Sequence, residues 1–336
     1  MKRKPKIAVI GAKGFPALGG AARANEAIFT RLKDKYDVTV YAISSHASVP
    51  DYHGIKQIIF NAYKNKKITV FLYYIRSLLH ALFNGNYDLV HVNHASAGFI
   101  VPFLKLRFKT VLNVRGGIKH DYDNKWKWRE KQLFYLFHWM GFRFASKVVT
   151  VQKGSVPMLE PYSSGNIIFI PNGVDHNIEI LPNNLTLKYD ITFSAARIIY
   201  LKGLHLLFEA LNDIKFNGKV QIVGDIDQVS EYKNYILNLA ENLDCEFTGL
   251  VQSKLELFKR IGQSRLFVFP SYSEGMSNML LEAASLRVPI IASDIEQNKD
   301  VFNDEEMLFF ERGRSKDLAE KIRYAIDNQG VMTDKA

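Results

Sequence analysis

Two carboxylates, Glu274 and Glu282, lie close to the expected start of a helix. The apolar run 266–269 before them predicts a buried strand, Gly275 indicates a turn, and helical spacing of apolar residues begins near Ser277. A helix N-terminus attracts anions, and an ionised carboxylate accepts hydrogen bonds from hydroxyl groups. The stretch therefore suits a ligand that carries both phosphates and hydroxyls, such as a sugar nucleotide. The spacing alone fits an alternative without a ligand equally well, in which one glutamate lies at a helix start and the other is solvated.

Two cations, Arg197 and Lys202, flank a second turn, between an expected strand and an expected helix that starts at Gly203. Arginine offers a planar fork of donors and lysine a point charge, and the helix start adds free N–H groups. This combination is typical of a diphosphate site. Without the other motifs, however, the same two residues are equally well explained as solvated surface cations.

A loop that contains several glycines, residues 11–20, follows a short apolar strand at 6–11 and precedes an expected helix at 21–32. Strand, glycine-rich loop and helix form the first unit of many α/β domains, in which the ligand binds at the carboxyl end of the strand. The glycines match neither the GxGxxG pattern nor a Walker A loop, so a tight turn without a ligand is the alternative.

The composition fits two α/β domains. The 336 residues exceed one typical domain, and a hydrophobic content of 47% supplies two cores. The single cysteine, Cys245, excludes a disulfide framework and fits a reducing compartment. The apolar run 7–11 is too short for a signal peptide, and the run 68–83 is shorter than the ~20 apolar residues that a membrane span needs.

Charge is distributed unevenly along the chain. Residues 1–165 contain 26 Lys and Arg against 9 Asp and Glu, a net charge of +17, whereas the remainder contains 18 against 25, a net charge of −7. This asymmetry predicts an anionic partner for the first half, such as a membrane surface, a phosphorylated lipid or nucleic acid. Because no nucleic-acid-binding motif is recognisable, we expect no nucleic-acid partner.

Apolar strands alternate with helices through both halves of the chain, which predicts parallel sheets covered on both faces. A change in character near 166–186 divides the chain into an N-terminal domain, 1–165, and a C-terminal domain, 166–336. The predicted fold class is α/β, with two Rossmann-like doubly wound domains and the largest cleft between them. The expected strands are 6–11, 38–43, 57–60, 89–93, 110–114, 147–151, 167–170, 190–194, 220–223, 246–247, 266–269, 288–292 and 308–310. The expected helices are 21–32, 68–83, 97–106, 126–144, 203–211, 230–243, 255–261, one from about 277, and 316–328.

These motifs together resemble the retaining glycosyltransferases of family 4, which have the GT-B fold of two Rossmann-like domains. The resemblance covers most of the C-terminal half. In the N-terminal half it rests mainly on the glycine loop, which resembles that of the rhamnosyltransferase-like branch. The matching stretches are 11–20, 172–175, Arg197 with Lys202 and Gly203, Glu274 and Gly275 with Glu282, and 288–294.

The resemblance implies a role for each matching residue. Arg197 and Lys202 would bind the donor diphosphate and neutralise charge on the departing nucleotide. Glu274 would hold hydroxyls of the donor sugar, and Glu282 those of the ribose. The implied catalytic residues are therefore Glu274, Arg197 and Lys202. Further donor-binding groups would come from Gly19, Gly20, Gly275, Met276, Ser277 and Asn278.

The resemblance also implies transfer with retention, by front-face attack in which the leaving phosphate takes the proton of the acceptor. No metal site is expected in this fold, because cations and helix ends stabilise the charge of the leaving group. We therefore expect no metal and no cofactor, with a donor of the UDP, GDP or dTDP type as a substrate.

The first half departs from the family pattern on the acceptor side. Many relatives have a histidine where this chain has Arg115, and an arginine there could hold an anionic acceptor. His94, at the end of strand 89–93, and His120 are further acceptor-side candidates, with structural or solvated roles as the alternatives. Residues 296–298 replace a usual glycine pair. The last helix, which crosses back to the first domain in many relatives, is expected to be short or absent.

Two stretches, 64–83 and 125–144, combine Lys and Arg with aromatic residues. Amphipathic surfaces of this composition bind anionic lipid, although packing of helices on the sheet would account for at least half of the same residues. The sequence therefore predicts a cytoplasmic protein that is peripheral at the inner face of the cell membrane.

The sequence as a whole predicts a retaining, metal-independent glycosyltransferase that acts in surface polysaccharide biosynthesis. It would move a sugar from a nucleotide diphosphate donor to a lipid-linked glycan or oligosaccharide acceptor, as in the synthesis of lipopolysaccharide or capsule. The rival enzymes are a nucleotide-sugar epimerase and a sugar-phosphate synthase of the same fold. A rival of another class is an inactive, membrane-associated scaffold that binds nucleotide sugars.

Overall fold

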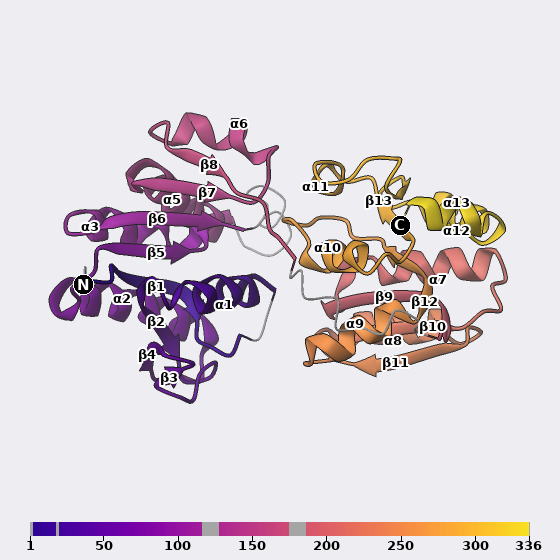
Figure 1. Ribbon diagram of the computed structural model, residues 1–336, viewed down its shortest axis with the longest axis horizontal. Helices are drawn as coiled ribbons and strands as arrows, with labels where there is room; N and C mark the ends of the chain where they lie inside the picture. The colour runs from indigo at the N-terminus through magenta and orange to yellow at the C-terminus, as the bar shows by residue number, and fades with distance from the viewer. Residues whose placement is uncertain (1–2, 18–19, 116–127, 175–185, 336) are drawn as a thin grey trace. The chain divides into compact units, whose positions relative to one another are not determined.

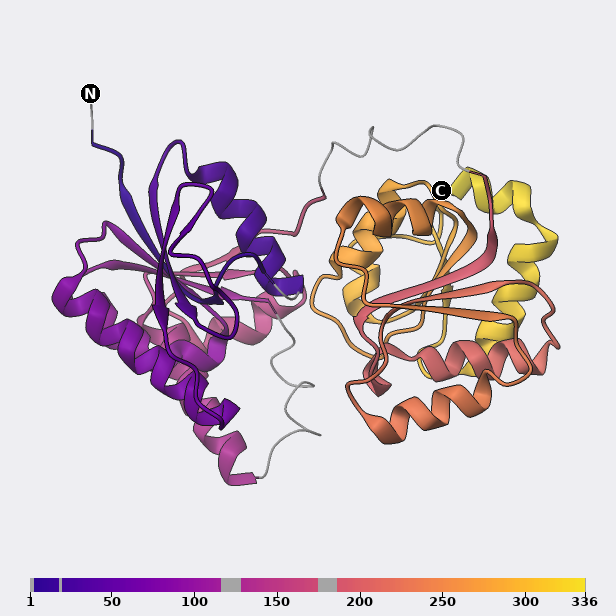
Figure 2. The same ribbon diagram turned by 90° about the horizontal axis from the view of Figure 1, so that it is seen from below.

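The computed structural model describes residues 3–17, 20–115, 128–174 and 186–335 (Figure 1). The chain divides into two compact units, Met1–Asn172 and Gly173–Ala336. In each unit a sheet dominated by parallel strands lies between layers of helices (Figure 2). The predicted class, α/β with two Rossmann-like doubly wound units, is confirmed.

The N-terminal sheet has the strand order β3-β4-β2-β1-β5-β6-β7-β8, and all of its neighbouring strands are parallel except β3 and β4. Its strands are β1 (Lys6–Lys13), β2 (Asp37–Ile43), β3 (Asp51–Tyr52), β4 (Ile55–Phe60), β5 (Leu89–Asn93), β6 (Lys109–Val114), β7 (Lys147–Thr150) and β8 (Ile167–Phe169). The helices described in this unit are α1 (Gly20–Leu32), α2 (Lys66–Asn84), α3 (Val101–Lys105), α5 (Trp128–Phe144) and α6 (Ser155–Leu159), with the 3-10 helices η1 (Ala95–Ile100) and η2 (Glu160–Tyr162).

The C-terminal sheet is parallel throughout, in the order β11-β10-β9-β12-β13-β14. Its strands are β9 (Tyr189–Arg197), β10 (Val220–Asp225), β11 (Cys245–Gly249), β12 (Ser264–Phe269), β13 (Ile290–Ser293) and β14 (Leu308–Phe310). The helices described are η4 (Tyr200–Lys202), α7 (Leu204–Asp213), α8 (Ser230–Leu239), α9 (Lys254–Gly262), α10 (Asn278–Ser285), α11 (Glu296–Lys299), α12 (Ser315–Asp327) and α13 (Gln329–Lys335).

Alternation of side chains along the central strands explains why both faces of each sheet are covered. In β12, Leu266 and Val268 belong to one buried core, whereas Phe267 and Phe269 belong to another. The first core also contains residues of α7 and α12, and the second contains residues of α9 and α10. A strand that is apolar on both faces must be covered by helices on both faces. The sequence of such a strand is therefore continuously apolar and does not alternate between apolar and polar residues.

Each sheet reverses its strand order once. In the N-terminal unit the chain runs outward from β1 to β2 and β4, and then returns to place β5 on the other side of β1. In the C-terminal unit the same reversal separates β9 from β12. Loops that leave the carboxyl ends of two such strands diverge to opposite faces of the sheet, which makes these positions the usual ligand sites of open α/β sheets.

The boundary between the units lies later than the predicted end of the first domain at residue 165. The reason is that β8 pairs in parallel with β7, from Val148 with Ile167 to Thr150 with Phe169, and so completes the first sheet. The predicted helix 97–106 is a 3-10 helix followed by the short α3. The short elements β3, α6, α11 and α13 were not predicted, and neither were the 3-10 helices η2 and η4.

None of the helices among the described residues is long and apolar enough to cross a membrane.

Candidate functional site

The loops that follow β9 and β12 form the candidate site of the C-terminal unit. The two strands are neighbours in the sheet, so their carboxyl ends bring Arg197 and Pro270 to the same edge. A backbone hydrogen bond of 2.9 Å from Tyr272 N to Leu201 O joins the two loops. The residues that were predicted to bind a diphosphate and those predicted to hold hydroxyls therefore lie at one switch point.

Gly203 permits this close approach of the two loops. Its backbone is left-handed, with φ of 70°, and a Cβ at this position would lie 2.0 Å from the carbonyl oxygen of Pro270. An L-residue at Gly203 would therefore be strained and would also collide with the neighbouring backbone. The same glycine lies between η4 and α7 and directly follows Lys202, so its backbone conformation fixes the position of Lys202 relative to α7.

Lys202 and Glu274 form an ion pair, with 2.5 Å between Nζ and Oε1. The side chains are 26% and 10% exposed, respectively. A carboxylate this far removed from water is costly unless a cation or hydrogen-bond donors compensate its charge, and Lys202 supplies such a cation. Arg197, the last residue of β9, is exposed to solvent at the same edge. The structure thus brings Lys202 and Glu274 into contact and places Arg197 at the same edge of the sheet, whereas their role in donor binding stays a prediction.

The segment from Gly275 to Asn278 leads into α10 as predicted. Ser277 caps the helix, because its hydroxyl accepts a hydrogen bond of 3.3 Å from Leu280 N. Asn278, the first residue of the helix, has a buried side-chain oxygen that accepts no hydrogen bond from any described residue. This helix start provides backbone donors beside Glu274, which is what binding of an anionic group requires.

Glu282 has a partner that the sequence reasoning missed. Its carboxylate lies 3.3 Å from Nζ of Lys254, the first residue of α9, and the two side chains are 15% and 48% exposed. No motif marks Lys254, since only the packing of α9 beside α10 brings it to Glu282. A ribose hydroxyl at Glu282 would therefore meet a carboxylate that is already held in place.

An aromatic cluster, also missed from the sequence, holds the loop that carries Glu274. Nε2 of the buried His205 lies 3.1 Å from the hydroxyl of Tyr272, and its Nδ1 lies 3.0 Å from the hydroxyl of Tyr232. Burial lowers the pKa of His205 and raises the pKa values of both tyrosines, so the network is neutral near pH 7.

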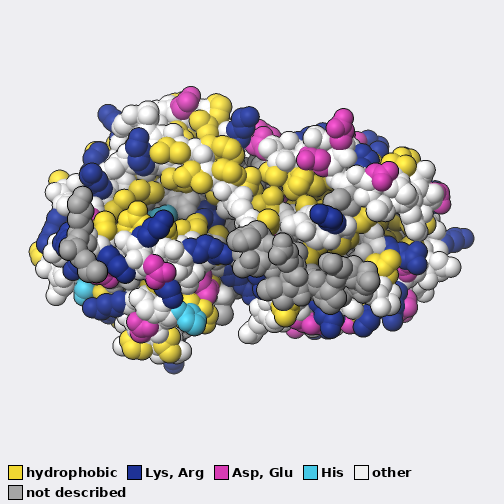
Figure 3. Space-filling view, in the orientation of Figure 1, with side chains coloured by type: hydrophobic (Ala, Val, Ile, Leu, Met, Phe, Trp, Pro, Cys, Tyr) yellow, Lys and Arg dark blue, Asp and Glu magenta, His cyan; other side chains and the backbone are white. Residues whose placement is uncertain are grey.

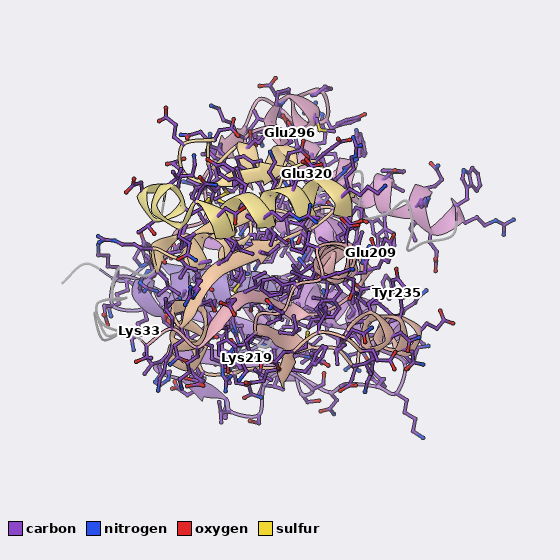
Figure 4. The ribbon with its side chains drawn as sticks, turned by 90° about the vertical axis from the view of Figure 1, so that its right-hand side faces the viewer. Lys33, Glu209, Lys219, Tyr235, Glu296 and Glu320 are labelled. Atoms are coloured by element: carbon purple, nitrogen blue, oxygen red, sulfur yellow. The ribbon has the colours of Figure 1, made fainter. Side chains whose placement is uncertain are left out.

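The rings of this cluster also stack. Tyr200 packs on His205 with ring centres 4.4 Å apart and on Tyr272 with centres 5.5 Å apart. At its outer side Tyr235 donates a hydrogen bond of 2.8 Å to Glu209, and both residues are labelled in Figure 4. The cluster unites residues from four separate segments, so only the fold reveals it.

In the N-terminal unit, the glycine loop is fixed by buried contacts. A Cβ at Gly11 would lie 2.4 Å from the carbonyl oxygen of Asn93, so a glycine is needed where β1 passes β5. Gly11 N also donates to the hydroxyl of Tyr73 at 2.6 Å. Further along, the side chain of Gln57 bonds both the N–H and the carbonyl of Phe15, at 2.7 and 2.8 Å.

Of the acceptor-side candidates, His94 and Arg115 lie at the ends of the adjacent strands β5 and β6. His94 keeps part of its surface exposed, yet desolvation and then the charges of Lys13 and Arg115 lower its pKa to about 4. The imidazole is therefore neutral near pH 7. His91 lies within β5 and packs edge-on against Phe29, with ring centres 5.3 Å apart, as expected for a structural residue.

Two of the predicted site residues, Gly19 and His120, lie outside the described residues. Gly20 is the first residue of α1. Among the described residues, no group of three or more His, Cys, Asp or Glu side chains is placed to hold a metal ion.

Comparison with known families assigns both halves of the chain. Residues 18–178 match the model of Glycosyltransferase Family 4, and residues 177–335 match that of Glycosyl transferases group 1. The chain belongs to the GT-B glycosyltransferases. The predicted fold and family are thereby confirmed, whereas the retaining mechanism and the rhamnosyltransferase-like branch stay predictions.

Two curated relatives illustrate the family. The Staphylococcus aureus capsular polysaccharide biosynthesis glycosyltransferase CapM is 26% identical over 199 residues, which are 55% of this chain and 50% of that protein. The Campylobacter jejuni N,N'-diacetylbacillosaminyl-diphospho-undecaprenol alpha-1,3-N-acetylgalactosaminyltransferase is 26% identical over 160 residues, 47% of this chain and 41% of that protein. The chain thus spans half or less of the length of these curated relatives.

Among solved structures, Anabaena HepE in complex with UDP-glucose has a TM-score of 0.77 and 17% identity to this chain. The match covers 98% of this chain and 92% of the HepE chain. At this identity the likeness shows the fold alone.

We predict that Gly203→Ala destabilises the C-terminal unit by about 2 kcal/mol or more, because the new Cβ meets the Pro270 carbonyl and the backbone is left-handed. Denaturant unfolding of the purified variant measures this loss. Gly330→Ala is the matched control: its Cβ has open space within α13, so stability should stay the same or rise by up to about 1 kcal/mol. Equal stability of the two variants would contradict the assigned role of Gly203.

Proposed function

We propose that this chain transfers a sugar from a nucleoside diphosphate donor to a glycan acceptor in polysaccharide biosynthesis, with retention and without a metal ion. The observation that carries the proposal is the Lys202–Glu274 pair at the switch point of the C-terminal unit, beside Arg197 and the start of α10. This edge offers cations and N–H donors for a diphosphate and carboxylate acceptors for sugar hydroxyls. These are the two chemistries that a sugar nucleotide presents.

The proposed reaction breaks the bond between the anomeric carbon and the diphosphate oxygen. The acceptor hydroxyl oxygen bonds to the same face of the anomeric carbon, and its proton passes to the departing phosphate oxygen. Negative charge develops on the diphosphate as the bond breaks, so Arg197 and Lys202 would stabilise the transition state more than the ground state. Because Lys202 is held in place by Glu274 before the reaction and Arg197 adds a second positive charge, a metal ion is not required in this scheme.

Glu274 would act as a holder of the donor sugar and not as a general acid. Its carboxylate already pairs with the Lys202 ammonium, so it presents acceptor lone pairs to sugar hydroxyls in a fixed direction. A donor diphosphate would give Lys202 a second anionic partner on the other side of the ammonium. The ion pair thereby couples recognition of the sugar to recognition of the diphosphate within one unit.

The acceptor is proposed to be lipid-linked. The names of the two curated relatives support this: one acts in capsular polysaccharide biosynthesis, and the other is named for a diphospho-undecaprenol substrate. The proposed location is the inner face of the cell membrane, and the proposed contact is a surface of the N-terminal unit formed by α2, α3 and α5, which we call the α2–α5 surface.

The α2–α5 surface exposes more apolar area than packing on the sheet explains. Helix α5 buries His138, Gly141 and Phe142, yet its outer side carries Leu133, Leu136 and Trp139 at helical spacing, and these are 50%, 49% and 44% exposed. On the side of this unit that Figure 3 shows, hydrophobic side chains also lie among Lys and Arg. The other exposed apolar side chains of the surface are Ile68, Phe71, Leu79, Phe83, Phe103, Leu106, Trp128, Tyr135 and Phe144.

Contacts between the helices make this one surface. Lys67 of α2 pairs with Glu130 of α5 at 2.9 Å, and rings of Phe71, Phe99 and Phe137 form a continuous series between the two helices. Exposed apolar side chains beside cations are typical of proteins that lie on anionic bilayers. We infer that the acceptor lipid and this surface share the same membrane.

We predict that Glu274→Gln lowers kcat for sugar transfer by at least about a hundredfold, because a neutral amide loses the charge-assisted bonds to the donor sugar. Transfer is measured with labelled donor and a membrane fraction that contains the acceptor. Glu320→Gln, on the exposed face of α12 (Figure 4), is the matched control and should keep full activity and the same melting temperature. Full activity in folded Glu274→Gln would contradict the site.

The same assay separates the rival functions. An epimerase would convert the free nucleotide sugar without an acceptor, and a scaffold would bind it without any product. Acceptor-dependent release of the nucleoside diphosphate favours the transferase over both.

We predict that the protein floats with vesicles that contain phosphatidylglycerol at low salt and that binding weakens as salt is raised, because exposed charges are screened. Phe83→Ser with Trp128→Ser removes two strongly exposed side chains, 77% and 72%, and should reduce the bound fraction severalfold. Tyr324→Ser, 43% exposed on α12 of the other unit, is the control and should bind as the unaltered protein does. Equal flotation of all three proteins would count against the α2–α5 surface.

A further inference from the structure

The carboxyl edge of the N-terminal sheet gathers cations at its centre. Lys13 lies at the end of β1, His94 directly follows β5, and Arg115 directly follows β6; these three strands are consecutive in the sheet. The register pairs Asn93 with Asn113, and His94 N donates to the carbonyl of Asn113 at 3.1 Å. The three basic side chains, which we call the strand-end cluster, thus start from neighbouring positions.

One carboxylate reaches the same edge of the described sheet: Glu26 of α1 accepts a hydrogen bond of 2.7 Å from Ala17 N, in the loop after β1. The described residues that follow β1, β2, β5, β6 and β7 before the next element are free of Asp and Glu. Carboxylates occur instead at the opposite edge: Asp37 begins β2, and Asp88 precedes β5 and pairs with Arg3 at 2.7 Å. The described segments at the centre of this edge therefore carry positive charges and no carboxylate of their own, at the end where α/β sheets bind ligands.

Arg115 has a donor that no described residue uses. Its Nη1 donates to the neutral side-chain oxygen of Asn172 at 2.9 Å, while its Nε is buried and makes no hydrogen bond within the described structure. None of the ion pairs among the described residues involves Arg115, and desolvation lowers its pKa. A guanidinium that has an unused buried donor and a neutral hydrogen-bond partner can bind an anionic ligand without first breaking an ion pair.

The backbone at this edge is also unusual. Lys13 and His94 both adopt left-handed conformations, with φ of 66° and 72°. Such conformations are costly for residues with a Cβ and are found most often where a side chain or an N–H must be aimed. Here Tyr73 fixes the end of β1 through its bond from Gly11 N.

We propose that the strand-end cluster binds a phosphoryl group of the acceptor, with Arg115 as the fork donor and Lys13 as the second positive charge. Two full charges match the dianion of a phosphate or diphosphate better than a single carboxylate. The neutral imidazole of His94 supplies a further donor or acceptor at this edge. This inference rests on the proposed function, and it names the acceptor class of that reaction: a glycan or lipid that carries phosphate.

The test is a titration of the full chain with inorganic diphosphate, observed through the Nε–Hε signals of ¹⁵N-labelled arginine side chains. The Arg115 signal is identified by its loss in Arg115→Gln. We expect it to shift saturably in the unaltered protein and in Lys202→Met, in which the C-terminal site is impaired. Arg107→Gln, an exposed arginine of the same unit, should leave the titration unchanged. Absence of a shift at Arg115 overturns the proposal.

A second arm identifies the source of the phosphate. In protein saturated with the nucleoside diphosphate, inorganic diphosphate should still shift the Arg115 signal, because the proposed diphosphate-binding cations of the donor site, Arg197 and Lys202, belong to the C-terminal unit. Loss of the shift under nucleotide would assign the cluster to the donor and overturn the proposal. Lys13→Gln should weaken diphosphate binding by about tenfold, and it tests the cluster even where Arg115→Gln fails to fold.

Kinetics completes the test. Arg115→Gln should raise KM about tenfold or more for an acceptor that carries diphosphate, and should leave KM unchanged for the same glycan without phosphate. An equal effect on both acceptors would contradict the proposal. Because the titration needs no turnover, a failure of sugar transfer itself would contradict the proposed function without altering the outcome at Arg115.

Discussion

The ion pair between Lys202 and Glu274 is the interaction on which the account of the C-terminal unit depends. A carboxylate that is 10% exposed needs a compensating charge, and the structure supplies one 2.5 Å away from a different loop. Several local features serve this pairing: Gly203 lets the loops approach, the Tyr272–Leu201 backbone bond joins them, and the aromatic cluster around His205 holds Tyr272. The pair thus follows from the sheet topology, since β9 and β12 are neighbours only because the strand order reverses there.

The two units use the same topology for different chemistry. At the switch point of the C-terminal unit, a carboxylate and a cation are paired, which suits a ligand with both hydroxyls and phosphates. At the switch point of the N-terminal unit, the described strand ends carry Lys13, His94 and Arg115 without a carboxylate, which suits an anion. The overall charge of +17 in the first half agrees with this local pattern, and with the membrane contact that we propose for the α2–α5 surface.

Much of the fold could be predicted from the sequence, because apolar runs, glycines and helical spacing are local signals. The predicted strand 266–269 lies within β12, and the helix predicted to start near Ser277 begins at Asn278. The boundary at residue 165 was too early, since no local signal shows that β8 pairs with β7. Lys254 beside Glu282 and His205 beside Tyr272 could not be predicted for the same reason: each contact joins segments that only the tertiary fold brings together.

The most direct test of the central claim is a thermal-shift panel of UDP, GDP and dTDP with their sugars, on the full chain and on Lys202→Met. A ligand at 100 times its Kd stabilises a protein by about 2.7 kcal/mol, so specific binding is readily measured. The account predicts that one nucleotide class raises the melting temperature of the unaltered protein and that Lys202→Met loses most of this rise. A panel without any rise, or an undiminished rise in Lys202→Met, would contradict the claim that this ion pair marks the donor site.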